Sequence, residues 1–512
     1  METPHPIRRT REALIFRRAE WNARSLLDRR RDRVRQKARA RRWGMVVLIV
    51  VGALALVVGL PWLVWQGPYT LDSKHLDDDE LAKGSAALVT GLRTALVACV
   101  AALGAGFALF YTARTYRLTR RGQITERFTK ALERLGSQQQ YVRIGGILAL
   151  EQIIQDAPEQ AATDAARVLG HFIRDRAPQA IPVTPAPAPE GSAPASASPT
   201  PEEPPPEPDA DVQAALTALT RAESRTHVDP REVLDLHGLH LAGAQLHQAD
   251  LTEANLTEAT LTEANLTRAT LTKADLTDAN LTEADVAYAT LANAYLIDAT
   301  LNGANLTDAN LTDADLRGAR LNGASLTDAN LTDADLTDAT LSRADLTGAE
   351  LNGAHLDGAK LTKARLNGAK LTKAYLRGAR LNGANLTGAI LTEAHLEGAK
   401  LATAFLSDAK LTKADLRGAT LTGAHLDGAT LTEADLRNTK LTEADLRNTK
   451  LTKADLGGAI LTEAKLHGAV LTRAKLHGAD LSHVRGLTQP LTKAQTDEKT
   501  VLPPARQQLA TP

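Results

Sequence analysis

A period of five residues dominates the sequence. From Leu236 to Leu481 a leucine occupies every fifth position, fifty positions in all, with Val286 as the one exception. Alanine lies two residues before these positions in 46 of the fifty repeats. A helix repeats every 3.6 residues and a strand every two, so neither element explains this period. A heptad coiled coil is excluded for the same reason.

A square coil satisfies the period. If each five-residue unit forms one side and the chain then turns a corner, four units return to the start and every Ala and Leu faces the axis. Only 3% of the residues are aromatic, and small Ala alternating with Leu fills a narrow interior without them. If backbone hydrogen bonds stack successive coils ~4.8 Å apart, the fifty units form a rod roughly 60 Å long. We expect Thr after the Leu to bond a neighbouring turn.

The motif A-[DN]-L-x-x resembles the signature of the pentapeptide-repeat family. The segments ANLTE at 254–258 and ADLTD at 334–338 match it fully. The resemblance implies a right-handed quadrilateral β-helix, so we predict a mainly β fold over 236–485. The ending GLTQPLTKAQTDEKTVLPP resembles the caps of such solenoids, which places a C-terminal cap and tail at 486–512.

The N-terminal region has the pattern of a membrane hairpin. Residues 1–42 hold fifteen Lys or Arg against five acids and form a basic arm. An uncharged run from Trp43 to Trp65 and a second apolar stretch up to Tyr111 predict a two-helix transmembrane hairpin over 43–112, with helices at about 45–65 and 86–111. A cleaved signal peptide fits poorly, because the arm and the run are too long and no A-x-A site follows.

The charges that flank the two stretches predict their orientation. The arm and the segment after the second stretch are basic, whereas the connection 66–84 is acidic. Positive flanks stay in the cytoplasm, so we expect a multi-pass protein of the cell membrane with both termini cytoplasmic. The arm is predicted to attract anionic lipid, with nucleic acid as the less favoured partner. Cys99 is expected to be an inert residue in lipid.

Helical periodicity follows the hairpin. Apolar residues predict helices at about 124–135, 141–155 and 159–176, a cytoplasmic helical module over 113–177 with the second helix central. Residues 178–208 contain twelve prolines and predict an extended linker that gives reach. A further helix within the N-terminal cap, 209–235, either returns to the module or covers the rod. The hairpin, GQITERFTKALERLG and YVRIGGILALEQI together resemble a group of actinobacterial membrane-anchored pentapeptide-repeat proteins.

Charge is graded along the repeats. Residues 241–340 hold sixteen acids and four bases, whereas 341–485 hold fifteen acids and twenty-one bases. The band 358–392 has no acid and is the candidate site for an anionic partner. Its seven bases are Lys360, Lys363, Arg365, Lys370, Lys373, Arg377 and Arg380. A twenty-residue coil stacks Lys360, Arg380 and Lys400 in one column. A solvated band that only keeps the rod soluble is the alternative interpretation.

No motif indicates catalysis. Phosphate loops, nucleophile elbows and paired metal-ligand motifs are missing from the sequence, so we predict no enzyme, no cofactor and no metal site. His355 and His395 are expected on one face two coils apart, too far to share a metal. Glu133, Glu151 and His171 have no spacing that would bring them together.

We therefore predict a membrane-anchored interaction or scaffold protein that presents a charge-graded rod to an unknown protein partner, in an oligomeric state that the sequence leaves open. Some pentapeptide-repeat proteins resemble B-form DNA in outline and inhibit gyrase, so a DNA mimic is the first alternative. Acidity in only half of the rod argues against it. An electrostatic binder of nucleic acid or another polyanion through 358–392 is the second alternative.

Overall fold

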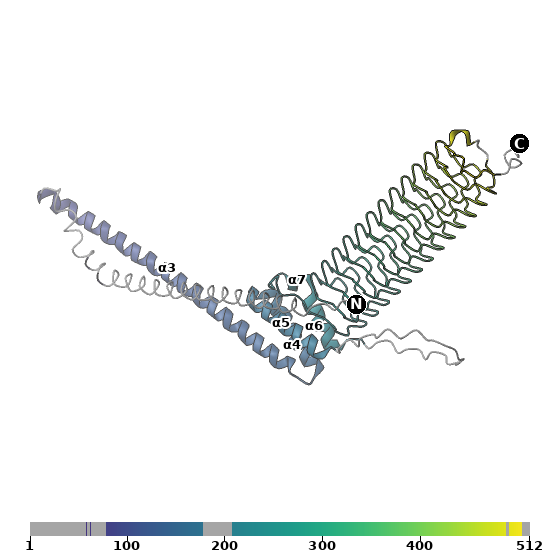
Figure 1. Ribbon diagram of the computed structural model, residues 1–512. Helices are drawn as coiled ribbons and strands as arrows, with labels where there is room; N and C mark the ends of the chain where they lie inside the picture. The colour runs from purple at the N-terminus through teal and green to yellow at the C-terminus, as the bar shows by residue number, and fades with distance from the viewer. Residues whose placement is uncertain (1–57, 59–61, 63–77, 178–206, 488–490, 504–512) are drawn as a thin grey trace, which may run out of the picture. The chain divides into compact units, whose positions relative to one another are not determined.

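The computed structural model describes residues 58, 62, 78–177, 207–487 and 491–503 (Figure 1). The chain divides into two compact units, Met1–Arg120 and Arg121–Pro512. The first predicted membrane span, at about 45–65, lies outside the described residues apart from Val58 and Trp62.

A single long helix, α3 (Asp78–Leu135), contains the second predicted span. Within the described residues, Val97–Leu135 is the one helical stretch long and apolar enough to cross a membrane, by length and composition. Apolar side chains such as Leu103, Phe107 and Leu109 are exposed along it. Threonine hydroxyls bond within the helix, as Thr112 Oγ1 does by donating to Ala108 O at 2.8 Å. The helix has no break at 112–113, where the sequence analysis separates the hairpin from the helical module.

The helical module lies in the second unit. It contains α4 (Gln140–Asp156), α5 (Glu159–Arg176), α6 (Ala210–Thr220) and the short α7 (Ala222–Arg225), together with the end of α3. Its core is formed by apolar side chains from α4, α5 and α6, among them Ile147, Leu150, Leu169 and Leu216. The end of α3 approaches α4 closely at Gly146, where a Cβ would lie 2.9 Å from the carbonyl oxygen of Ala131.

Helix α6 returns to this module, which corrects the expectation that the Pro-rich linker gives reach. Asp211 of α6 is fully buried and its Oδ2 lies 2.6 Å from Arg143 Nε of α4. The same helix contacts the start of the rod, because the backbone N–H of Asp250 donates to the carbonyl oxygen of Thr220 at 2.6 Å. Since the chain on both sides of 178–206 belongs to one packed module, the linker does not set the distance between module and rod.

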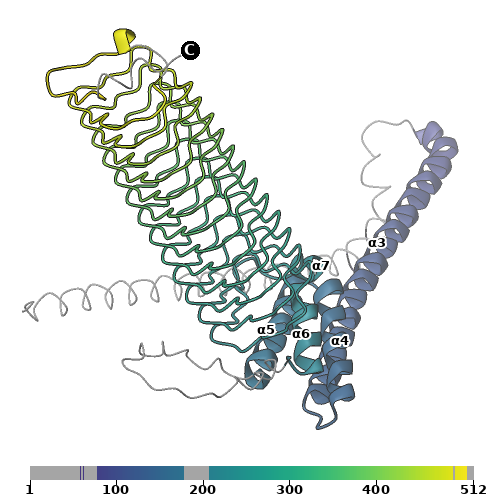
Figure 2. The ribbon, with the colours of Figure 1, turned by 90° about the vertical axis from the view of Figure 1, so that its right-hand side faces the viewer.

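The rod begins at residue 235 and consists of stacked square coils (Figures 1 and 2). Each coil takes twenty residues, because parallel bridges pair residues twenty apart, as in Lys360↔Arg380. The inward Leu and Ala side chains are almost completely buried, and Leu361, for example, has no exposed surface. The square interior predicted from the five-residue period is therefore present.

Each corner of the coil is a tight turn. The backbone N–H of Ala364 donates to the carbonyl oxygen of Leu361 at 3.0 Å, and Lys363 between them has φ 58°. The Asn or Asp before the Leu supports the turn: Asn330 Oδ1 accepts from the backbone N–H of Thr332 at 3.0 Å and from its hydroxyl at 2.7 Å. The repeated [DN]-L-T sequence is thus explained by an Asx turn at the corner.

Backbone pairing in the rod differs from that of an ordinary sheet. Along the sides of the coils in the described chain, residues pair through isolated parallel bridges and no extended strand forms. The mainly β expectation is correct for the hydrogen bonding between coils, and a corner at every fifth residue keeps each side too short to form an extended strand. At the far end, bridges from Lys475 to Gln495 and from Asp480 to Val501 add residues after the last repeat to the ladder, next to the 3₁₀ turn η2 (Leu491–Lys493).

Candidate anion-binding surface of the rod

The twenty-residue register distributes the seven predicted site residues around the rod. Lys360 and Arg380 lie in one column with Lys400, as expected. Arg365 and Lys370 each lie at the middle of another side, since they pair with Asp345 and Glu350 one coil below. Sequence neighbours five residues apart point in different directions, so the band 358–392 is not one surface.

Four of the seven bases already have acidic partners. The nitrogen–oxygen distances are 3.2 Å for Arg365–Asp345, 2.5 Å for Lys370–Glu350, 3.8 Å for Lys373–Glu393 and 3.4 Å for Arg377–Glu397. Each pair joins residues twenty apart and therefore links adjacent coils. Exposed pairs of this kind contribute little to stability, but they cancel charge locally. These four residues are thus poor candidates for binding an external anion.

The remaining three bases belong to a larger surface, which we call the basic side. It comprises one side of the coils and the corner that follows it, between Glu283 and Glu443. Over this length the basic side contains no acid. Its seven exposed cations are Arg320, Arg343, Lys360, Lys363, Arg380, Lys400 and Lys440. None of the seven forms an ion pair with a described residue, and four of them lie outside the band that the sequence analysis selects.

The neighbouring surfaces are balanced by comparison. Arg417 contacts Asp415, Glu397 and Asp435, with nitrogen–oxygen distances of 2.5, 3.3 and 3.7 Å. Burial alone would raise the pKa of Asp415, but the hydrogen bonds from the side chain and backbone of Arg417 outweigh it and hold that pKa below its usual value. Acids and bases on the side that precedes the basic side therefore neutralise each other.

Acidic residues in the first half of the rod do not form one face either. Asp250, Asp275 and Asp285 lie at the middle of three different sides, and Glu263 and Glu283 lie on the fourth. Several of these carboxylates are used at corners, since Asp275 Oδ1 accepts from the backbone N–H and the hydroxyl of Thr277.

A ladder of rings occupies the side that precedes the basic side. His355 and His395 lie two coils apart, as expected, and Tyr375 is stacked between them with ring centroids 4.5 and 4.9 Å away. Among the described residues no group of three His, Cys, Asp or Glu could hold a metal ion. The ring faces are occupied by each other, so this ladder offers packing rather than ligand chemistry.

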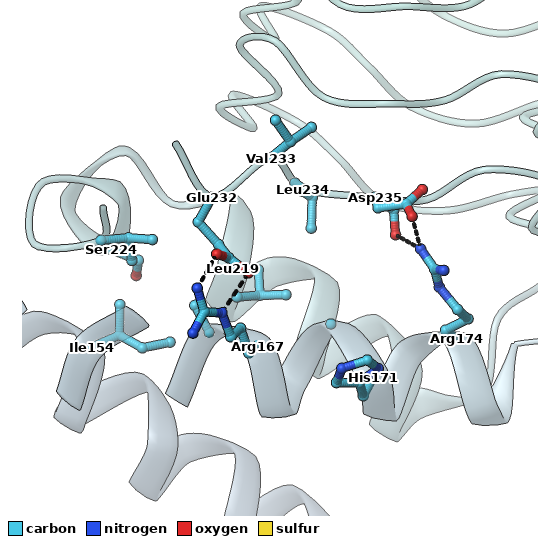
Figure 3. A pocket seen from close by; sticks show the side chains of 13 residues that line it. Ile154, Arg167, His171, Arg174, Leu219, Ser224, Glu232, Val233, Leu234 and Asp235 are labelled. Carbon is cyan, nitrogen blue, oxygen red and sulfur yellow. Dashed lines mark hydrogen bonds and ion pairs between the residues drawn. The ribbon is translucent and has the colours of Figure 1, made fainter. Parts of the chain in front are cut away.

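A small pocket lies where α5 faces the segment that leads into the rod (Figure 3). Its volume is about 220 Å³ and its walls include Ile154, Leu219 and Leu234. Two ion pairs bridge α5 to this segment, Arg167–Glu232 with a nitrogen–oxygen distance of 2.7 Å and Arg174–Asp235 (Figure 3).

Sequence spacing gives no signal for this pocket, because its walls come from elements separated by the linker. His171 lines the pocket. Glu151, which the sequence analysis considers together with His171, instead contacts Arg221 at 2.6 Å.

Comparison with known proteins agrees with the coil geometry. The family profile of pentapeptide repeats (8 copies) matches overlapping segments from residue 240 to residue 485. No curated protein sequence matches the chain.

Several solved structures are similar. HetL, a pentapeptide repeat protein involved in heterocyst differentiation regulation in the cyanobacterium Nostoc sp. strain PCC 7120, is 37% identical over 42% of this chain and 88% of its own, with a TM-score of 0.22. A pentapeptide repeat protein from the thylakoid lumen of Arabidopsis thaliana is 29% identical over 21% of this chain and 69% of its own, with a TM-score of 0.15. The plasmid-mediated fluoroquinolone resistance protein QnrB1 is 17% identical over 35% and 87%, with a TM-score of 0.25. From its repeats and its square coils, the chain belongs to the pentapeptide-repeat family, whose fold is a right-handed quadrilateral β-helix.

Proposed function

We propose that this chain is a non-catalytic, membrane-anchored interaction protein whose rod binds an anionic partner through the basic side. One observation carries the proposal. Seven exposed cations share a surface without any acid, whereas most Lys and Arg residues on the other sides have an acidic partner. Like charges stacked in a column oppose folding, so a surface that keeps them unpaired is best explained by a ligand of opposite charge.

The membrane anchor is the second part of the proposal. Its support is the apolar stretch within Val97–Leu135 and the exposed Leu103 and Phe107. With the basic flanks of the sequence, this favours an integral protein of the cell membrane with two spans and both termini cytoplasmic. Cys99, the one cysteine of the chain, provides the test. In sealed membranes it should resist a membrane-impermeant maleimide and become labelled after detergent is added, and labelling without detergent would contradict the span.

Two quadruple variants test the basic side. In the first, Lys360, Lys363, Arg380 and Lys400 are replaced by Gln. In the control, Arg365, Lys370, Lys373 and Arg377, which all have acidic partners, are replaced by Gln. Both variants remove four positive charges from overlapping coils, so they share the same change in net charge.

The measurement is the salt concentration at which the full chain, purified in detergent, elutes from immobilised heparin. We expect the basic-side variant to elute at much lower salt than the parent chain and the control variant to elute close to the parent, because binding of a polyanion depends on the cations that face it. Equal effects of the two variants would mean that net charge alone matters, and the proposed function would be wrong.

A further inference from the structure

The basic side is straight as well as acid-free. Each of its midpoints pairs with the residue exactly one coil away, from Thr300↔Arg320 through Lys360↔Arg380 to Thr420↔Lys440, without a slip in register. Six coil steps separate Arg320 from Lys440, which at ~4.8 Å per step makes a row roughly 29 Å long. The coils stack in an even series along this length (Figure 2). Five of the seven cations therefore lie in one row along this side of the rod, and Arg343 and Lys363 lie at the corner that follows it.

Small polar residues occupy the positions between these cations. Between Glu283 and Glu443, threonine, serine, asparagine, glycine and Ala402 fill the other outward positions of the side, and no aromatic or large apolar side chain is exposed there because the leucines face the axis. The asparagines are used within the ladder: Asn382 Oδ1 accepts from the backbone N–H of Ala402 at 3.1 Å, and Asn322 Oδ1 accepts from Ser342 at the same distance. Long Lys and Arg side chains are thus the groups that reach solvent.

This chemistry discriminates between classes of anionic partner. Protein interfaces depend on aromatic and apolar anchors at their centre, and single-stranded nucleic acid is held by aromatic side chains that stack on the bases. The basic side has neither. Double-stranded DNA turns once in roughly 34 Å, so its two backbones cross a straight row of this length at only a few points. A planar layer of anionic headgroups meets every cation of the row.

We infer that the basic side binds the anionic headgroups of a lipid bilayer, an inference that rests on the proposed function. The chain carries a candidate membrane-spanning stretch in α3, so a lipid surface is present wherever the chain is anchored. Because the anchor tethers the rod to the bilayer, contact between the basic side and lipid no longer requires a separate encounter, so even weak attraction is effective. Each basic residue near an anionic surface strengthens binding roughly fivefold.

Two matched positions test which side of the rod touches lipid. In a Cys99→Ser background, a single cysteine is placed at Thr420, on the basic side, or at Thr430, half a coil away on the opposite side. Both residues are partly exposed threonines in the middle of a side, and both can carry an environment-sensitive fluorophore. The full chain is reconstituted in nanodiscs of phosphatidylcholine alone or with phosphatidylglycerol, each containing a headgroup-linked quencher.

Phosphatidylglycerol discs should quench the label at 420 and leave the label at 430 bright. Replacing Lys360, Lys363, Arg380 and Lys400 by Gln should abolish this quenching, as should about 0.5 M salt, which screens exposed charges beyond a few ångströms. Equal quenching at 420 and 430, or quenching that does not depend on phosphatidylglycerol, overturns the inference.

The heparin experiment keeps this inference separate from the proposed function. If heparin binding depends on the basic side but the label at 420 is not quenched, the surface binds a polyanion other than lipid. In that case protection of the label by a DNA duplex would assign the side to nucleic acid. If heparin binding does not depend on the basic side and the label at 420 is not quenched, the proposed function itself is refuted.

Discussion

The buried ion pair between Arg143 and Asp211 is expected to hold α6 against α4 within the helical module. Asp211 is fully buried and Arg143 is 6% exposed, and their closest nitrogen–oxygen distance is 2.6 Å. Arg143 also donates to the carbonyl oxygens of Ser137 and Gln138. Removing one partner of such a pair leaves an uncompensated buried charge, which costs about 3–5 kcal/mol. Asp211→Leu should therefore weaken the packing of α6 on α4 by that amount.

Hydrogen exchange of the backbone amides of α6 measures this loss in the full chain. A cost of about 3–5 kcal/mol predicts exchange between roughly 10² and 5 × 10³ times faster in Asp211→Leu if α6 opens as a unit. In the double variant Arg143→Met/Asp211→Leu both charges of the buried pair are gone. Arg176, whose Nε lies 3.4 Å from Asp211 Oδ2, is one-third exposed and stays in contact with water, so most of the protection should return. Lys130→Gln serves as the control, because its ion pair with Glu126 is exposed and contributes little to stability. Acceleration of less than about tenfold in Asp211→Leu would show that apolar contacts alone hold α6.

Three further predictions concern the rod. Leu361→Ala removes a fully buried side chain and should cost about 2–5 kcal/mol, measured as faster amide exchange in the adjacent coils, and an unchanged exchange rate would contradict the packed interior. Thr403 is the one β-branched residue with a left-handed backbone in the described rod (φ 55°), so Thr403→Gly should raise the free energy of unfolding by about 1 kcal/mol, and a lower urea midpoint would refute this. Hydrogen bonds from Arg417 and Arg447 outweigh burial and lower the pKa values of Asp415 and Asp445. Their contribution to stability should be complete above the unfolded value of about 4 and be lost as the pH falls through the lower folded values, so acid titration should show a stability plateau above about pH 5.

Much of the rod could be predicted from the sequence because one short-range rule is repeated fifty times. The five-residue period requires Ala and Leu to face the axis, and Leu361 and Ala364 are buried as that rule demands. The contacts made by the polar positions are harder to predict from the sequence. The sequence analysis expects threonine to bond a neighbouring turn. Thr462 does so, because its Oγ1 donates to Asp480 Oδ2 of the next coil at 3.2 Å, whereas Thr332 bonds Asn330 two residues earlier and stabilises its own corner. Local capping competes with contacts between coils, and sequence alone does not show which contact forms.

Packing across the linker could not be predicted, because it depends on contacts between residues about seventy positions apart. The burial of Asp211 against Arg143 emerges only when α4 and α6 are placed together. The same is true of Arg167 and Glu232, which join α5 to the segment before the rod. A Pro-rich composition identifies a segment without a core, but it does not decide whether the flanking helices separate or pack.

The candidate site shows that charged residues must be grouped by their position on the twenty-residue coil and not by a continuous segment of sequence. A window along the sequence selected Lys360 and Arg365 together, although they lie on different sides of the coil and Arg365 contacts Asp345. Counting every twentieth residue instead separates paired from unpaired cations and adds Arg320 and Lys440 to the surface. Most ion pairs on the rod join residues twenty apart or two apart, so pairing follows the columns and corners of the coil. A column that contains bases and no acid cannot neutralise itself, and its charge is therefore available to an external partner.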